Sequence, residues 1–112
     1  MLIEIEVLNY LETKLNVPVC TEQPTGGVSE YVVFQVIDRG LQNHINSATV
    51  EFYSYAESNC AAAELDELVR QAMLDIVELP EISASKLGGG RNDKDDTLKR
   101  YRYRSYFNLF FY

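Results

Sequence analysis

The C-terminal segment, residues 98–112, constrains the fold more than any other part of the chain, because it alternates without a break up to the final residue. Side chains on a strand point alternately to opposite faces, so the even-numbered positions share one face and the odd-numbered positions the other. Such a strand would span about 50 Å, whereas an ordinary strand spans about 17–20 Å. We therefore predict an overlong edge strand, part of which pairs with or packs against another chain.

Three arginines and several aromatic residues share one face of this segment, and they suit it for contact with protein. Tyr and Arg are enriched at the centres of interfaces because they bury large areas while keeping a polar tip. Packing in the core of the same chain explains the aromatic residues at the chain end less well, because consecutive aromatic side chains point to both faces of the strand. If exposed, they would promote aggregation unless a partner covers them. The predicted contact residues are Arg100, Arg102, Arg104, Tyr106, Phe110 and Tyr112.

The net charge of −7 is divided unevenly along the chain. Residues 1–85 hold three basic and fourteen acidic side chains, whereas residues 86–112 hold seven basic and three acidic ones. This division favours a heterologous contact, in which the basic end of one copy meets the acidic body of the next. The alternative is that the arginines pair across the sheet with acids of the same chain, such as Glu51. The sequence leaves both possibilities open.

The first half of the chain predicts a helix followed by three strands. Apolar residues recur at helical spacing within residues 2–15, namely Ile5, Leu8, Leu11 and Leu15. Strands are predicted over residues 17–21, 31–37 and 48–55, and the second is apolar on both faces, which is typical of a central strand. Asp38-Arg39-Gly40 is expected to end that strand, with a polar connection over residues 41–47. In the third strand, alternation places Ala48, Val50 and Phe52 inward and Thr49, Glu51, Tyr53 and Tyr55 outward.

The second half predicts another helix and two more strands. Ser58 is a favourable N-cap for a helix over residues 59–78, with Asp66 and Arg70 paired on its solvent side. Its apolar stripe is formed by Ala61, Leu65, Leu68, Val69, Ala72 and Ile76. Pro80 ends this segment, and a weaker strand follows over residues 81–87. Residues 88–96 are expected to form a mobile glycine-rich loop before the long final strand.

The element order α-β-β-β-α-β-β, without βαβ periodicity, predicts an α+β fold. We expect a mainly antiparallel sheet of four to five strands with two helices on one face. A length of 112 residues fits a single domain, 1–112, with a core of its own. The helices would cover one side of the central strand, whereas its other side, with the aromatic rows, lacks an obvious cover from the same chain.

Residues suited to catalysis or metal binding are few. His44 is the only histidine, and Cys20 and Cys60 have no metal-ligand spacing, so we expect two reduced, largely buried cysteines and no metal or cofactor. We therefore predict that the protein is not an enzyme. A small enzyme with a site around His44 and Cys60 is the rival hypothesis.

Two charged or glycine-rich stretches resemble ligand-binding loops only superficially. Gly88-Gly89-Gly90-Arg91 lacks the spacing of a phosphate-binding loop, and a strand follows it where such loops need a helix. The aspartates of residues 93–96 lack the glutamate that completes a calcium loop. A hairpin loop and a solvated charge cluster are the simpler interpretations.

Basic and aromatic residues interleave on the final strand, as they do on platforms for single-stranded nucleic acid. Alternation nevertheless places the three arginines on one face and Tyr101 and Tyr103 on the other, and the acidic body would repel phosphate. We therefore expect no nucleic-acid partner, and a small nucleic-acid-binding regulator is the weaker alternative. No apolar run is long enough to span a membrane and no signal peptide is evident, so we expect no membrane contact and a cytoplasmic location.

Three features of the layout occur together. An N-terminal helix leads to Val17-Pro18-Val19, the strand over 48–56 runs directly into an Ala-Glu-Leu helix over 61–73, and a Gly-rich loop precedes a long aromatic last strand. This layout resembles the small tail terminator proteins, also called tail completion or minor capsid proteins, of long-tailed bacteriophages and prophages. The resemblance covers nearly all of the chain.

The resemblance implies an α+β subunit that assembles into a hexameric ring, caps the finished tail tube and offers a surface to the head-side connector. It implies no catalytic or ligand residues. The implied partners are further copies of the chain, the tail tube protein and the connector. The implied location is the virion tail, assembled in the bacterial host cytoplasm. Another head–tail joining protein, a connector or a stopper, is the alternative.

Overall fold

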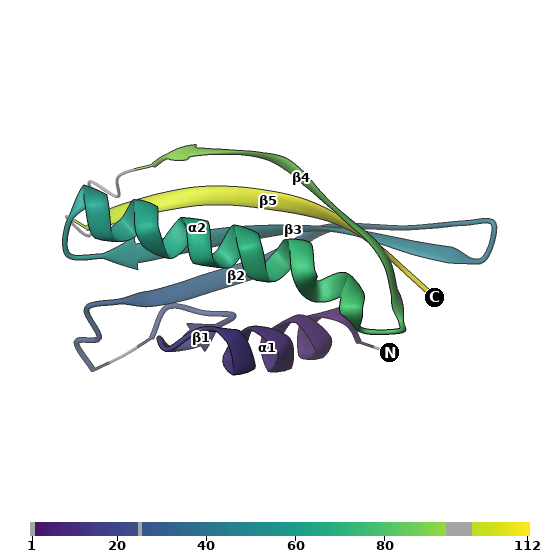
Figure 1. Ribbon diagram of the computed structural model, residues 1–112, viewed down its shortest axis with the longest axis horizontal. Helices are drawn as coiled ribbons and strands as arrows, with labels where there is room; N and C mark the ends of the chain where they lie inside the picture. Colours follow the sequence, from purple (N-terminus) through teal and green to yellow (C-terminus); the bar gives the residue numbers. More distant parts are fainter. Residues whose placement is uncertain (1, 25, 94–99) are drawn as a thin grey trace.

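The computed structural model describes residues 2–24, 26–93 and 100–112, which form a five-stranded sheet and two helices. In chain order the elements are α1 (Ile3–Lys14), β1 (Val19–Cys20), β2 (Tyr31–Gln42), β3 (Ile45–Ala56), α2 (Asn59–Asp75), the 3-10 helix η1 (Ile76–Glu78), β4 (Ile82–Asn92) and β5 (Tyr101–Phe111). The strand order is β1-β2-β3-β5-β4 (Figure 1), and only β1 and β2 run parallel. The predicted α+β fold is confirmed, with a mixed sheet.

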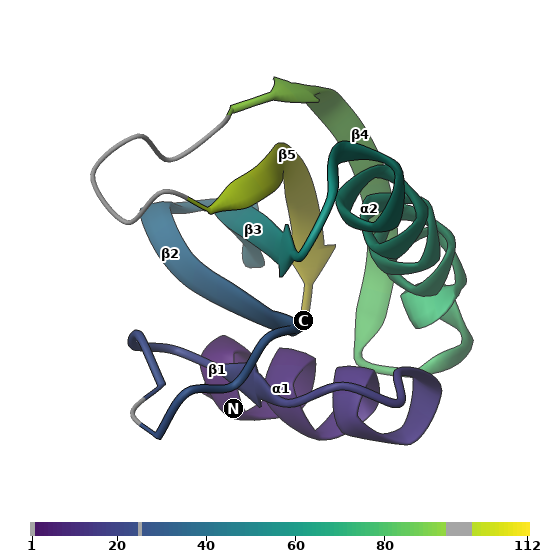
Figure 2. The ribbon, with the colours of Figure 1, turned by 90° about the vertical axis from the view of Figure 1, so that its left-hand side faces the viewer.

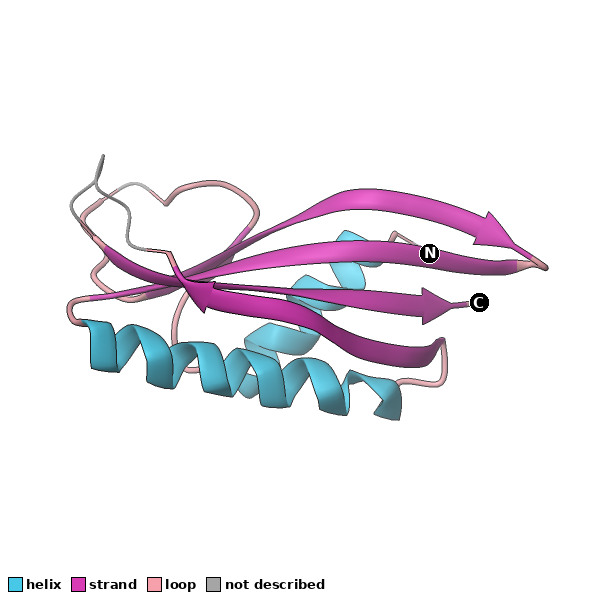
Figure 3. Cartoon of the chain, turned by 90° about the horizontal axis from the view of Figure 1, so that it is seen from above, coloured by secondary structure: helices cyan, strands magenta, loops and turns pink. Residues whose placement is uncertain are grey.

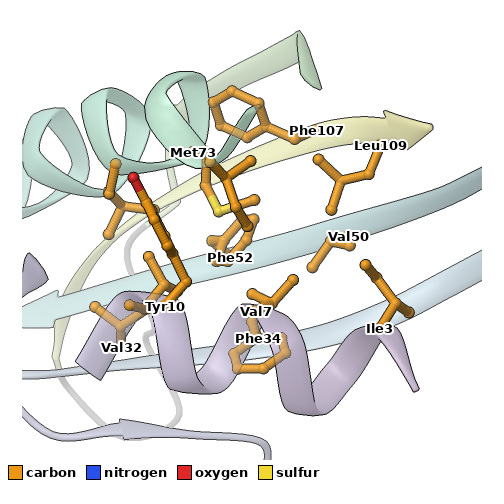
Figure 4. Close-up of a cluster of buried hydrophobic side chains, with 14 of the residues drawn as sticks. Ile3, Val7, Tyr10, Val32, Phe34, Val50, Phe52, Met73, Phe107 and Leu109 are labelled. Carbon is orange, nitrogen blue, oxygen red and sulfur yellow. The ribbon is translucent and has the colours of Figure 1, made fainter. Parts of the chain in front are cut away.

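Both helices pack on one face of the sheet (Figure 2), as predicted, and enclose a single core with it. Phe52 of β3 lies at the centre of this core, 5.7 Å from the ring of Phe34 and 6.1 Å, edge to face, from the ring of Phe107. Figure 4 shows side chains of α1, α2 and the strands meeting there. Burying one such ring stabilises the fold by roughly 1.5–3 kcal/mol. The largest fully buried side chains include Tyr55, Phe34, Phe52, Phe107, Ile3, Leu11, Met73 and Ile76.

The helices begin as predicted but turn partly different faces to the core. Ser58 caps α2, because its Oγ accepts a hydrogen bond from the backbone N–H of Ala61 at 3.1 Å. On α1 the buried residues are Ile3, Val7, Tyr10 and Leu11, whereas the predicted stripe residue Ile5 is 51% exposed. Leu68 of α2 is likewise 59% exposed. Each helix carries more apolar residues than one face can bury, so contact with the sheet selects the stripe.

The Asp66–Arg70 pair forms, but it faces the sheet rather than solvent. Arg70 Nε lies 2.7 Å from Asp66 Oδ2, and Asp66 is only 3% exposed. Burial raises the pKa of the Asp66 carboxyl above its ordinary 3.8, and the Arg70 guanidinium only partly offsets this. The predicted solvent location is therefore wrong. Arg70 fits beside β4 because Gly90 has no side chain; a Cβ there would lie 2.3 Å from Arg70 Nη2.

The hairpin between β2 and β3 is longer and its turn tighter than predicted. Asp38-Arg39-Gly40 does not end β2, which continues to Gln42 through an irregularity between Val36 and Asp38. The turn consists of Asn43 and His44, both with positive φ (51° and 64°), as a two-residue turn matching the strand twist requires. We call residues 38–47 the hairpin arm; its tip extends past both helices (Figure 1).

The C-terminal strand is not an edge strand. β5 lies between β3 and β4 and is paired with both along nearly its whole length (Figure 3). The predicted face division is correct, since Ser105, Phe107, Leu109 and Phe111 are buried against the helices. The need for another chain to pair with this strand is therefore removed, because β3 and β4 are equally long and supply its hydrogen bonds.

The glycine-rich segment is a strand rather than a loop. Gly88-Gly89-Gly90 belong to β4, with a bulge between Leu87 and Gly89. The glycines allow the ring of Tyr106 to lie against the β4 backbone, since a Cβ on Gly88 would lie 2.1 Å from Tyr106 Cε2. Asp95 and Asp96 of the predicted loop, and Leu98 and Lys99 of the predicted strand, lie outside the described residues.

Candidate functional site

The predicted contact residues of β5 lie on the sheet face that points away from the helices, which we call the outer face. Arg102, Arg104, Tyr106 and Phe110 alternate with the buried core residues of β5, so all four project to this side. Their neighbours across the β3–β5 ladder are, respectively, Tyr55, Tyr53, Glu51 and Ser47. The outer face therefore combines arginines, tyrosines and one glutamate in register.

Arg102 is held by groups of its own chain. Its guanidinium carbon lies 4.8 Å from the ring centroid of Tyr53 and 5.8 Å from that of Tyr55, and its Nη1 donates to the Tyr55 hydroxyl at 2.9 Å. Its Nη2 also forms an ion pair with Asp93 Oδ2 at 3.0 Å. This side chain thus ties the start of β5 to β3 and to the end of β4.

A loop of the same chain covers this end of the outer face. Tyr31 and Tyr55 stack with their centroids 4.6 Å apart, and Gln23 bridges their hydroxyls with two hydrogen bonds of 2.9 Å. Arg100 lies over Tyr31 at 5.5 Å and donates to the carbonyl of Val28 at 2.9 Å. Tyr55 points outward as predicted, beside Arg102, but this cover leaves it only 1% exposed. The alternation pattern of a strand does not reveal the loop and side chains that cover this end of the outer face.

Arg104 pairs with the acid that the sequence suggested. Its Nε lies 3.2 Å from Glu51 Oε1. Glu51 points outward as predicted, but side chains of its own chain bury it. The Tyr53 hydroxyl donates a hydrogen bond to the same carboxylate oxygen. Burial, followed by the hydrogen bond and charge of Glu51, raises the pKa of Tyr53 to about 12. Pairing of arginines within the chain is therefore confirmed at Glu51.

We expect the Tyr53–Glu51 contact to be visible in an alkaline titration. Tyr53 should ionise near pH 12 in the folded protein but near 10 when unfolded, so its contribution to stability is complete below pH 10 and is lost as pH rises to 12. Tyr10, whose pKa is also raised to about 12, should titrate in the same late phase. Tyr53→Phe should reduce the late phenolate absorbance, because it removes one of the two groups whose pKa is raised to about 12. An unchanged late phase in Tyr53→Phe would contradict the contact.

The remaining predicted contact residues occupy different parts of the surface. Tyr106 lines an open hollow of about 310 Å³ together with Arg104 and the glycines of β4. Phe110 lies under Lys86, whose Nζ is 5.8 Å from the ring centroid, and lines a second hollow along the hairpin arm. Tyr112 is 67% exposed at the end of the chain and lines a third hollow beside Ile3. The structure thus groups Arg104 with Tyr106, and Arg100 and Arg102 lie with the tyrosines of β2 and β3. Phe110 and Tyr112 lie apart from both groups.

The arrangement of arginines and tyrosines changes one argument about nucleic acid. The prediction placed the arginines and the tyrosines Tyr101 and Tyr103 on different faces of the strand. The neighbouring strands β3 and β2 nevertheless bring other tyrosines onto the face that carries the arginines. Two of these, Tyr31 and Tyr55, are buried and stacked on each other, so no base can stack on them. This cluster of arginines and tyrosines is formed by pairing between strands, so the pattern within any single strand could not identify it.

The rival site around His44 and Cys60 does not assemble. His44 lies in the turn of the hairpin arm and Cys60 in the first turn of α2, at opposite ends of the long axis of the molecule (Figure 1). Both cysteines are free; Cys60 is exposed, which corrects the prediction of burial, and Cys20 is partly buried. In the part of the chain that the structure describes, no three His, Cys, Asp or Glu residues are grouped to hold a metal ion.

Neither described helix is long and apolar enough to cross a membrane. Comparison with known proteins shows no matching family model and no significant match among curated proteins.

Proposed function

We propose that this protein is a non-enzymatic virion assembly protein that forms a homo-oligomeric ring at the head–tail junction of a long-tailed bacteriophage, where it caps the tail tube and contacts the connector. The hairpin arm is the observation that carries this proposal. Leu41 at its tip is 70% exposed, and Ile37 and Ile45 are exposed near it. The last residues of the arm, 42–45, extend beyond β5, whose pairing with β3 ends at Asn46↔Phe111, and a two-stranded tip has little stability of its own in water. Exposed apolar side chains around this tip suit a neighbouring surface.

The layout of charge supports association with further copies of the chain. The solvent side of α2 is acidic, whereas arginines gather on the outer face, on the other side of the sheet. Two different surfaces of one subunit can meet head to tail, and such heterologous contacts build either a closed ring or an open filament. A closed ring would end the growth of a tail tube, because its far face no longer matches a tube subunit.

The structure also limits which predicted contacts can act between subunits. Arg100 and Arg102 are engaged by their own chain, so replacing them would disturb the fold as well as any interface. Tyr106, Phe110 and Tyr112 keep accessible surface and remain proposed contact residues, together with Arg104 and the tip of the arm.

The proposal predicts that the arm controls assembly. In sedimentation velocity the unaltered chain should form a closed oligomer, and Leu41→Glu should shift it towards monomer with no change in melting temperature, because the side chain is exposed. Val77→Glu, at another exposed apolar position, is the matched control and should assemble normally. The oligomer should also limit the length of tubes formed by the tail-tube protein of the same phage or prophage.

Three results would count against the proposal or part of it. A chain that remains monomeric at every concentration and leaves tube length unchanged would remove both ring and cap. Tight, strongly salt-dependent binding of oligonucleotides would favour the nucleic-acid alternative instead. Binding to the connector without any effect on tube length would move the assignment to a connector or stopper.

A further inference from the structure

Two arginines face each other across the β4–β5 ladder. Arg91 and Arg104 are directly opposed in register, and both line the hollow of about 310 Å³ on the outer face. Like charges at directly opposite positions of a sheet destabilise it. Glu51 balances Arg104 at 3.2 Å, whereas Arg91 is exposed and makes no ion pair with any described residue. Among the described residues, the two guanidinium groups that line this hollow therefore share one carboxylate, that of Glu51.

The backbone of β4 shapes this hollow. Gly88 and Gly89 at the bulge leave room for the ring of Tyr106, which forms an apolar wall beside the two arginines. A guanidinium binds a carboxylate through two parallel hydrogen bonds, and an aromatic wall accommodates the aliphatic stem of a glutamate. The hollow is suited to a single acidic side chain that approaches from outside the sheet.

The exposed side of α2 carries such side chains. Glu64, Glu67 and Asp75 are all exposed, and Leu68 is exposed among them. The one basic residue of α2, Arg70, turns inward to Asp66, so the solvent side of the helix has no cation of its own. Glu64 and Leu68 are four residues apart and lie on the same side of the helix, which offers a carboxylate next to an apolar contact.

We propose that the Arg91–Arg104 hollow receives a glutamate, Glu64 or Glu67, from α2 of a second copy of this chain. α2 and the outer face lie on opposite sides of the sheet (Figure 2), so a subunit cannot fill its own hollow. The contact is therefore heterologous, and repeating it joins copies in series. This inference rests on the proposed self-assembly and specifies the charged part of its interface.

The test is a charge swap followed by sedimentation velocity. Arg91→Glu should weaken self-association on the order of tenfold, and the double variant Glu64→Lys/Glu67→Lys should do the same. Mixing the Arg91→Glu chain with the double variant should restore association, because the swapped charges attract again. Lys86→Glu makes the same charge change on the same strand outside the hollow, and should weaken association no more than about threefold.

The outcomes separate this inference from the proposed ring. Normal assembly of Arg91→Glu, or failure of the mixture to recover, would overturn the hollow as the contact while leaving the ring in place. A monomeric unaltered chain would overturn both. Binding of a single-stranded oligonucleotide that Arg91→Glu abolishes and Lys86→Glu retains would assign the hollow to phosphate and overturn the inference. Arg91 is exposed and opposes a like charge, so its replacement by glutamate should not lower the melting temperature, and a loss of association would not be due to unfolding.

Discussion

Deletion of residues 108–112 is expected to leave the chain unfolded. The deleted residues form the last part of β5, which is hydrogen-bonded to β3 on one side and β4 on the other. Leu109 and Phe111 are buried in the core, and losing each costs roughly 1.5–3 kcal/mol in hydrophobic burial alone. Domains of this size are stable by only about 5–15 kcal/mol, so the loss of both side chains and of two strand pairings should abolish cooperative thermal unfolding.

The matched control is deletion of Tyr112 alone. That side chain is mostly exposed, although its backbone N–H donates to the carbonyl of Glu81 at 3.0 Å. The shorter chain should therefore melt within a few degrees of the full one when followed by circular dichroism. A 108–112 deletion that still melts cooperatively would show that β5 contributes less to the core than its burial indicates.

Asp66→Ala is expected to lower the free energy of unfolding by about 2–4 kcal/mol. The substitution leaves the largely buried Arg70 guanidinium without its carboxylate, and an unpaired buried charge is costly. Denaturant unfolding of the two proteins measures the difference. Asp66→Ala/Arg70→Met removes both charges and should recover most of the loss, because the double variant leaves no buried ion unpaired. Equal losses in the single and double variants would contradict this account.

The same residue predicts a dependence on acid pH. Burial raises the pKa of Asp66 above its ordinary 3.8, so folding favours the protonated carboxyl. Its contribution to stability is complete below pH 3.8 and is lost as pH rises through the higher pKa of the folded protein. The Asp66→Asn side chain cannot ionise. The stability of this variant should therefore not decrease as pH rises above 3.8 in the way that the stability of the unaltered protein does.

Whether a segment forms a helix or a strand, and which of its faces is buried, could largely be predicted from the spacing of apolar residues within that segment. Alternation along β5 correctly separated its core face from its arginine face, because a strand imposes a period of two on any buried row. Ser58 identified the start of α2. The turn at Asn43-His44 was missed, although an asparagine between two alternating segments is a signal for a two-residue turn.

The candidate site was only partly predictable, because its chemistry arises between strands. The sequence indicated that Arg104 had an available acid in Glu51, but it could not show that Arg91 lies opposite Arg104. That juxtaposition depends on the strand order and on the bulge at Gly88. The glycines that suggested a loop instead make room for Tyr106.

By itself the sequence determined the two helices, the presence of five strands but not their full lengths, the two faces of β5 and the division of charge, because each follows from neighbouring residues and the geometry of one element. Only the tertiary structure decided that β5 is a central strand, that Asp66 is buried and that the outer face is partly covered by its own loop. Those outcomes depend on which distant segments pair and pack, and pairing is a property of the whole sheet rather than of any one strand.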